Sequence, residues 1–482
     1  MIATALLGLV LIAGVGLLGR RGGGFDLSAW TVGGRRFGAV ATFFLQAGEI
    51  FTTFTFLGIS GVVLGGGVAA MYLPSYLVLG YVGMFLVGPL MWRLGKRHGY
   101  RTNSDLLAHR FGSPVLGGLT AVLAVVFFMP VIQVQLMGLG TIVSFVTGDA
   151  ATGTTSVVVA TLLVLLFVVW SGLHGVAATS YLKDVLMVVA LVIIGVGVIA
   201  TRQPDGGVFA AVHDGARHLL TIRPGGEYGT AWYVSSVLVS GIGFGCMTLP
   251  SSWPAVLSGK SARAVASNHV WLPLYTVAVA IPVLVGFYAV AGGHGGDDDS
   301  ALLSLAQESL PPWLLAVVLI AGAACAMVPA AGGLVVIATL VSSNLVPERL
   351  PQRERLRAGR ITAGVVSVLV LALTLGRPDL MANLYLLTYS GVIQLAPANL
   401  LALRARVPVR ASAVLAGLIA GECVVLGSAV SGVSLFGISS GLVGLGVNLV
   451  VLAAVAAVQG RVPETGGAEP ERVAGRSGST VE

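Results

Sequence analysis

The sequence contains thirteen apolar runs of about 17 residues or more, and this repetition restricts the chain to one class of fold. An apolar helix of about 20 residues crosses the hydrocarbon core of a bilayer. Charged residues make up 10% of the chain, whereas a soluble domain carries about 25%. We therefore predict an all-α, polytopic membrane protein with about 13 transmembrane helices. The predicted spans are 2–19, 37–66, 69–92, 114–146, 153–172, 179–200, 230–258, 267–291, 311–346, 361–376, 379–402, 409–429 and 440–460.

The basic residues follow the pattern of an inserted membrane protein, whose cytoplasmic loops are rich in Lys and Arg. If the thirteen spans begin outside the cell, all but four of the 27 Lys and Arg residues fall on the cytoplasmic side. The four that remain outside are Arg202, Arg217, Arg223 and Arg377. We expect a plasma (cytoplasmic) membrane protein with its N-terminus outside and its C-terminus in the cytoplasm. The net charge of +7 then needs no nucleic-acid partner.

Several classes of protein lack support in the sequence. The three cysteines, Cys246, Cys325 and Cys423, lie in apolar spans without metal-ligand spacing, so neither disulfides nor zinc are expected. No phosphate-binding loop, nucleophile motif or zinc-protease motif occurs. The first span lacks the basic start and small-residue exit of a signal peptide, so we expect it to be retained. We expect no enzymatic activity and no cofactor besides a coupling ion, and the sequence carries no signal for an oligomeric state.

Two spans contain residues that interrupt helices. Span 37–66 has Gly48 and Glu49 at its middle. The interrupting residues of span 230–258 are Gly241, Gly243, Gly245, Pro250 and Pro254. Backbone groups freed inside the bilayer must find partners in protein or in a water-lined cavity. Two broken spans in matching positions of two halves are typical of a secondary transporter, so we predict that these breaks lie together and flank the substrate.

The order of the spans predicts an inverted repeat. Spans two to six and seven to eleven form two sets of five, and an odd number per set inverts one set against the other. The predicted parts are a leading helix and cytoplasmic loop (1–36), a transport core (37–402, with repeats 37–200 and 230–402), two trailing helices (403–460) and a disordered cytoplasmic tail (461–482).

Polar side chains within the spans are candidates for binding. Glu49 is a carboxylate at mid-membrane depth, which costs at least about 2.5 kcal/mol unless it is paired, neutral or hydrated. We expect it to be either a cation or proton ligand or a structural hydrogen-bonding group. Gln133 and Gln135 follow Pro130 and, being two apart, face different sides of their helix. The polar residues proposed for the substrate site are Gln46, Thr52, Thr53, Gln133 and Gln394.

Span seven suggests the chemistry of the substrate. The free amides at the start of a half-helix favour a carboxylate, and we expect that end near Thr248 to Trp253. Phe244, Met247 and Trp253 supply an apolar wall for a short acyl chain. Few polar side chains are present there for a sugar. This composition favours small carboxylates.

Five stretches together resemble the sodium:solute symporter family. They are Trp30-Thr-Val-Gly-Gly-Arg35, Gly48-Glu-Ile-Phe-Thr-Thr-Phe-Thr-Phe-Leu-Gly58, Lys96-Arg-His-Gly99, Tyr181-Leu-Lys-Asp184 and Leu272-Pro-Leu-Tyr275. The resemblance covers all thirteen spans, and the monocarboxylate (acetate, pyruvate, lactate) permease branch is the most similar. It implies a five-plus-five inverted-repeat fold with discontinuous second and seventh helices, one leading helix and two trailing helices, and a substrate between the breaks.

The resemblance also implies a sodium ion. Its backbone ligands would be the carbonyls around Ala47 or Gly48 and around Ile50 or Phe51. The family's remaining ligands, a carbonyl and two adjacent hydroxyls in the ninth span, align with Cys325, Val328 and Pro329. Val and Pro carry no hydroxyl, whereas a hard cation needs oxygen ligands.

Span six carries two charged residues that could compensate for the missing hydroxyl ligands. Asp184 aligns with an aspartate near the family's ion exit route, and Lys183 precedes it. The two are either a snorkelled interfacial pair or functional charges. In the second case, we hypothesise that the Lys183 ammonium reaches the vacated position, with coupling to protons or to sodium at an altered site.

The sequence therefore predicts cation-coupled symport, with sodium or protons, of a small organic solute by alternating access. A monocarboxylate is the expected substrate. The alternatives are a sodium-coupled proline or neutral amino-acid symporter and a transporter-like solute sensor.

Overall fold

The computed structural model describes residues 2–19, 27–148, 150–225, 227–294, 299–376, 379–433 and 437–460. Within these ranges the regular structure is helical, and isolated bridges such as that between Phe37 and Gly259 are its exceptions. This confirms the all-α fold class. The predicted disordered tail, 461–482, and part of the predicted leading loop, 20–26, lie outside the described residues.

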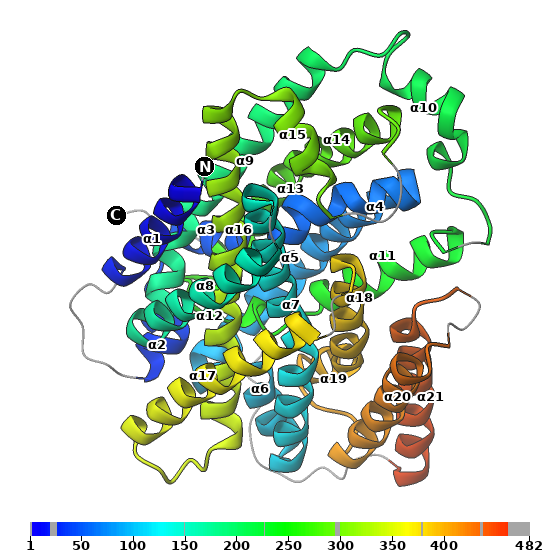
Figure 1. Ribbon diagram of the computed structural model, residues 1–482. Helices are drawn as coiled ribbons and strands as arrows, with labels where there is room; N and C mark the ends of the chain where they lie inside the picture. Colours follow the sequence, from blue (N-terminus) through cyan, green and yellow to red (C-terminus); the bar gives the residue numbers. More distant parts are fainter. Residues whose placement is uncertain are drawn as a thin grey trace, which may run out of the picture.

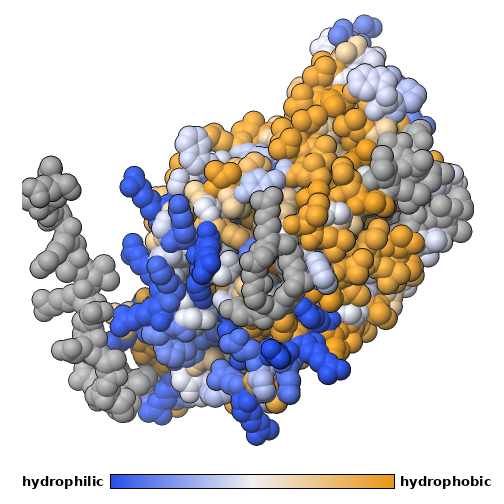
Figure 2. All heavy atoms as spheres, turned by 90° about the vertical axis from the view of Figure 1, so that its left-hand side faces the viewer, coloured by the Kyte–Doolittle hydropathy of each residue, from blue (hydrophilic) through white to orange (hydrophobic). Residues whose placement is uncertain are grey.

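The described helices have the length and surface of a membrane protein. Nine helical stretches in the described ranges are long and apolar enough to cross a bilayer. Outward faces are apolar, as on α9 (Leu173–Thr201), where Val185, Val189, Val192 and Val196 are exposed at helical spacing. Figure 2 shows such side chains over much of one face, with hydrophilic residues gathered toward one end. The chain is therefore a multi-pass membrane protein, and the count of thirteen crossings stays a prediction.

The first half of the core contains a discontinuous helix followed by four long ones (Figure 1). These are α3 (Ala39–Ile50) with α4 (Ile59–Gly66), then α5 (Tyr72–His98), α7 (Pro114–Thr147), α8 (Ala150–Ser171) and α9. The helices that precede or connect them are α1 (Ile2–Leu18), α2 (Leu27–Val32) and α6 (Asn103–Phe111).

The second half also contains a discontinuous helix followed by four helical stretches, two of which are divided, and the inverted repeat stays a prediction. It contains α11 (Thr230–Gly245) with α12 (Ser252–Leu257), α13 (Ala262–Thr276) with α14 (Ala280–Ala291), α16 (Pro312–Leu340), α17 (Gln352–Gly376) and α18 (Met381–Val392) with α19 (Ala396–Ala402). The pair α20 (Ala411–Ser431) and α21 (Ser440–Gln459) stands at one side (Figure 1). Two short helices, α10 (Val208–Ala216) and α15 (Ala301–Ser309), lie in connections.

Helix α16 lies at the centre of the bundle. Every residue from Ala321 to Leu340 is buried, and the helix packs against α7, α9, α1 and α3. Small residues permit this close packing. A Cβ atom on Gly333, for example, would lie 2.7 Å from the side chain of Ile132 on α7.

The first discontinuity comes slightly later than the sequence predicts. Helix α3 continues through Gly48 and Glu49 to Ile50, and the chain is non-helical at Phe51 and Thr52 before a π-helical turn, Phe54–Gly58, leads into α4. Gly48 serves close packing instead, because a Cβ atom there would lie 2.5 Å from Ser180 Oγ on α9.

The second discontinuity runs from Cys246 to Ser251, as Pro250 predicts. The three glycines before it remain helical, which corrects their predicted role. Gly241 and Gly245 bring α11 close to α5, since a Cβ atom on Gly241 would lie 2.6 Å from Leu79 and one on Gly245 would lie 3.2 Å from Gly83 Cα. Met247 takes a left-handed conformation with φ of 54°.

Candidate functional site

One face of α18 touches both discontinuities. The Tyr385 hydroxyl donates to Thr52 Oγ1 at 2.8 Å, at the first discontinuity. One turn later, the Tyr389 ring lies 3.4 Å from the position that a Cβ atom on Gly243 would take, just before the second. Helix α12 also packs directly against α3. The two breaks therefore lie in the same part of the bundle, with α18 between them.

A glutamine of α7 satisfies the backbone at the first discontinuity. Gln135 Oε1 accepts from the Thr53 amide at 3.1 Å and from Thr53 Oγ1 at 2.9 Å. Its Nε2 donates to the Tyr385 hydroxyl at 3.3 Å. Thr52, Thr53, Gln135 and Tyr385 thus form one buried network. Gln133 instead faces α17, where its Nε2 lies 3.4 Å from the Leu373 carbonyl oxygen.

Aromatic rings pack together where α5, α11 and α18 meet. The Tyr76 and Tyr389 ring centroids are 5.3 Å apart, and those of Tyr72 and Trp232 are 5.1 Å apart. The sequence reasoning missed these tyrosines, because a tyrosine in a membrane helix is commonly an interfacial residue. Only their contacts across the fold identify them.

Three hydroxyls in this region are buried without a partner among the described residues. They belong to Tyr72, Ser236 and Ser240, here called the hydroxyl cluster. Ser236 and Ser240 follow Trp232 by one and two turns of α11, on the face that contacts Tyr72 and Tyr389. Buried polar groups are nearly always hydrogen-bonded in native proteins, so the hydroxyl cluster indicates a site for a ligand or for water.

The span-seven residues singled out in the sequence hold the second discontinuity together. Trp253 Nε1 donates to the Met247 carbonyl oxygen at 2.9 Å, and Thr248 Oγ1 donates to that of Gly243 at 2.8 Å. Met247 is fully buried. The Phe244 ring packs against that of Tyr81, with centroids 5.3 Å apart.

Helix α12 has only six residues. The aligned peptide dipoles of so short a helix are too few for the predicted carboxylate site at its start. Two backbone carbonyls of this discontinuity accept hydrogen bonds from Asn399 of α19. Its Nδ2 donates to the Cys246 carbonyl oxygen at 2.9 Å and to that of Met247 at 3.3 Å.

Two other predicted substrate residues join helices elsewhere. Gln46 Nε2 lies 2.8 Å from His269 Nε2 on α13. Gln394 Nε2 donates to the Gly441 carbonyl oxygen at 2.9 Å, and Asn448 of α21 donates back to the Gln394 carbonyl at 2.8 Å. Neither contact places a glutamine beside the hydroxyl cluster.

Charged side chains gather on the α9 side of the first discontinuity. Lys183 Nζ donates to the carbonyl oxygens of Gly48 at 3.2 Å and Phe51 at 2.5 Å. It also lies 2.6 Å from Asp184 Oδ1, and both charged side chains are fully buried. This burial excludes the snorkelled interfacial pair. The Ala47 carbonyl, the predicted alternative to that of Gly48, accepts a hydrogen bond from the Phe51 amide at 2.9 Å. Ile50, the predicted alternative to Phe51, is half-buried.

Glu49 lies between these charges and α16. Its Oε1 is buried without a hydrogen-bond partner among the described residues. A Cβ atom on Gly332 would lie 1.6 Å from that oxygen, so the carboxylate occupies space that only a glycine leaves open. Cys325 and Val328 are buried on the same helix.

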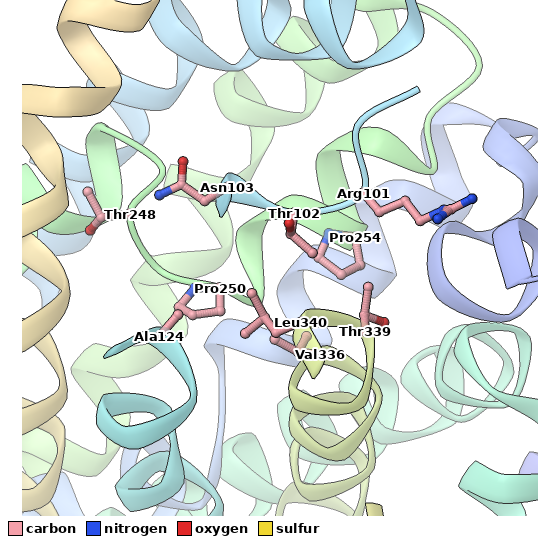
Figure 3. Close-up of a pocket in the computed structure, with 10 residues that line it drawn as sticks. All are labelled: Arg101, Thr102, Asn103, Ala124, Thr248, Pro250, Pro254, Val336, Thr339 and Leu340. Atoms are coloured by element: carbon pink, nitrogen blue, oxygen red, sulfur yellow. The ribbon is translucent and has the colours of Figure 1, made fainter. Parts of the chain in front are cut away.

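A narrow crevice lies beside the second discontinuity. Three segments line most of it (Figure 3). They are the second discontinuity with α12 (Thr248, Pro250 and Pro254), the start of α6 (Thr102 and Asn103) and the end of α16. Its volume of about 10 Å³ holds roughly one water molecule. Both polar atoms of the Asn103 side chain are buried without a partner in the described part of the chain.

A wider cavity of about 890 Å³ opens at the end of the bundle that carries α6. Tyr100, His109 and Arg355 are among its lining residues. Burial raises the pKa of Tyr100 to about 12, so its hydroxyl stays protonated and able to donate to His109 Nδ1, 2.5 Å away.

Comparison with known proteins identifies relatives over most of the chain. A model of the sodium:solute symporter family matches residues 30–421. The uncharacterized symporter YhjB of Bacillus subtilis is 33% identical over 58% of this chain and 57% of its own length. A monocarboxylate transport permease of Rhizobium johnstonii is 25% identical over 54% of this chain and 52% of its own. The chain thus spans a little over half the length of these curated relatives.

Two solved structures share the fold. A Na⁺-coupled sialic acid symporter, in a substrate-bound outward-open state, matches with a TM-score of 0.71 and 17% identity over 95% of this chain and 97% of the other. A nucleobase-cation-symport-1 family transporter, in a closed conformation, matches with a TM-score of 0.52 and 13% identity over 90% and 96%. At these identities the likeness shows the fold alone.

Proposed function

The chain belongs to the sodium:solute symporter family, and on this premise we propose that it carries a small monocarboxylate across the membrane together with a cation, by alternating access. The family and the fold are those of transporters. Membership implies a coupling cation, for which the family gives sodium, and a proton is the second candidate. We place the protein in the plasma (cytoplasmic) membrane, with its N-terminus outside.

The hydroxyl cluster is the observation that carries the choice of substrate. Each free hydroxyl can donate one hydrogen bond to a carboxylate oxygen. The rings of Tyr76 and Tyr389 beside it offer apolar surface to a short acyl chain. The resemblance to a monocarboxylate permease points the same way.

Uptake by proteoliposomes tests this proposal. Purified protein is reconstituted, and radiolabelled acetate, pyruvate and proline are supplied with a sodium gradient alone, a pH gradient alone or neither. We expect acetate or pyruvate to accumulate when a cation gradient is imposed, and protein-free vesicles are the control. Accumulation of proline alone would assign the amino-acid alternative. Saturable binding of a carboxylate without any uptake would assign a sensor.

A further inference from the structure

The buried ammonium of Lys183 is held at the first discontinuity by two hydrogen bonds and an ion pair. A lysine ammonium has three N–H donors. Two of them are donated to the carbonyl oxygens of Gly48 and Phe51, and the Asp184 carboxylate lies 2.6 Å away as an ion-pair partner. The two carbonyls are available because α3 ends at Ile50, and the last carbonyls of a helix lack partners within it.

The family resemblance assigns the backbone ligands of sodium to Ala47 or Gly48 and to Ile50 or Phe51. The carbonyls of Gly48 and Phe51 are therefore among the predicted sodium ligands. The rest of the implied ligand set does not fit a sodium ion. On α16, residues 328–333 read Val-Pro-Ala-Ala-Gly-Gly and supply no side-chain oxygen, and all six are buried. Hard cations are held by oxygen ligands, whereas a fixed ammonium needs only its three acceptors.

We propose that the Lys183 ammonium takes the place of the coupling sodium ion at the first discontinuity, so that this chain binds no coupling sodium. The charge at the position is the same as that of sodium, but it is covalently attached. The part of this inference that concerns transport rests on the proposed function. The part that concerns sodium binding is independent of it.

Direct binding of ²²Na⁺ to the purified protein tests the inference without transport. We expect no saturable binding by the wild-type chain. Lys183→Ala vacates the position and leaves the Gly48 and Phe51 carbonyls with the Asp184 carboxylate, so we expect about one sodium ion per chain to bind. Lys183→Met fills the space without a charge and is expected to bind none. Lys260→Ala, which changes an exposed lysine, serves as the matched control and is expected to behave as the wild type.

The outcomes separate clearly. Saturable ²²Na⁺ binding by the wild-type chain would overturn the inference, and this measurement does not depend on any variant folding. If a correctly folded Lys183→Ala variant, judged by size-exclusion chromatography, also fails to bind sodium, the lysine is not what excludes the ion.

A transport assay provides a second test of the inference. Carboxylate uptake by the wild type should be unchanged, within about twofold, when sodium is replaced by choline. A strict sodium requirement would contradict the inference while leaving monocarboxylate transport intact. Absence of all uptake would contradict the proposed function, and the ²²Na⁺ result would still decide the role of Lys183.

Discussion

The Tyr385 hydroxyl donates a hydrogen bond of 2.8 Å to Thr52 Oγ1, although 333 residues separate the two in sequence. This contact joins α18 to the residue at which the first half of the core loses its helical structure. Gln135 completes the junction from α7. Residues from the first discontinuity, α7 and α18 therefore form one network that sets the shape of this discontinuity. We expect transport to be sensitive to mutation of its members.

Gln135→Leu should weaken substrate binding. The change leaves the Thr53 amide and hydroxyl without their acceptor, which costs about 1–3 kcal/mol and should raise KM about tenfold. Gln133→Leu, two residues away and facing α17, is the matched control and should change KM by less than about twofold. Equal effects of the two variants on KM for uptake would show that the Gln135 network does not shape the site.

Ser240→Ala should lower substrate affinity without lowering stability. Its hydroxyl has no described protein partner to lose, so the unfolding midpoint should not fall, while KM should rise up to about tenfold if the hydroxyl binds the carboxylate. Ser235→Ala should do the reverse, because Ser235 Oγ donates to the Trp232 carbonyl and accepts the Ser439 amide. Paired uptake and thermal-unfolding measurements check both. An unchanged KM in Ser240→Ala would remove this hydroxyl from the site.

Asp184→Asn should slow uptake while the protein still folds. The asparagine keeps the shape and one acceptor for Lys183, and the Gly48 and Phe51 carbonyls still receive their two hydrogen bonds. The loss of one charge from a buried pair should change the stability of the cluster, and we expect that change to differ between the states of the transport cycle. Initial uptake rates provide the measurement, with the exposed Asp205→Asn as control. A wild-type rate in Asp184→Asn would exclude the carboxylate from the mechanism.

Gly332→Ala should displace Glu49, since the new Cβ atom would lie 1.6 Å from Glu49 Oε1. We expect a loss of uptake of about tenfold or more, because moving a buried carboxylate costs at least about 2.5 kcal/mol in a membrane interior. Gly364→Ala on α17 has open space around its Cβ and should leave uptake unchanged.

A double variant makes the Gly332 prediction specific. If the clash with Glu49 is the cause, adding Gly332→Ala to Glu49→Ala should have little further effect on uptake, because the clashing group is gone. Additive losses in the double variant would show that Gly332 acts through another neighbour.

The sequence predicts the existence of both discontinuities and the neighbourhood of the charged cluster. Pro250 marks the second, and the missing hydroxyls at Val328 and Pro329 single out Lys183. The position of the first is less predictable, because Gly48 meets a packing requirement against Ser180 that local sequence does not reveal. A glycine in a membrane helix serves close approach as readily as unwinding.

The identity of the residues around the substrate region was harder to predict. Gln133 and Gln135 are equivalent in composition, and only the rotation of α7 decides which one faces Thr53. Tyr76 and Tyr389 gain their significance from their contact between α5 and α18, and Tyr385 from its hydrogen bond to Thr52. Tyr72 gains its significance from its contact with Trp232 of α11. Such long-range pairings are set by tertiary packing.

Tyr385 and Tyr389 are separated by a single helical turn, so the distance between their backbones is fixed by the helix itself. A tilt or slide of α18 would therefore change its contacts with Thr52 and with Gly243 together. Because α18 contacts the chain at or next to both discontinuities, we expect a rearrangement at one of them to be accompanied by a movement at the other.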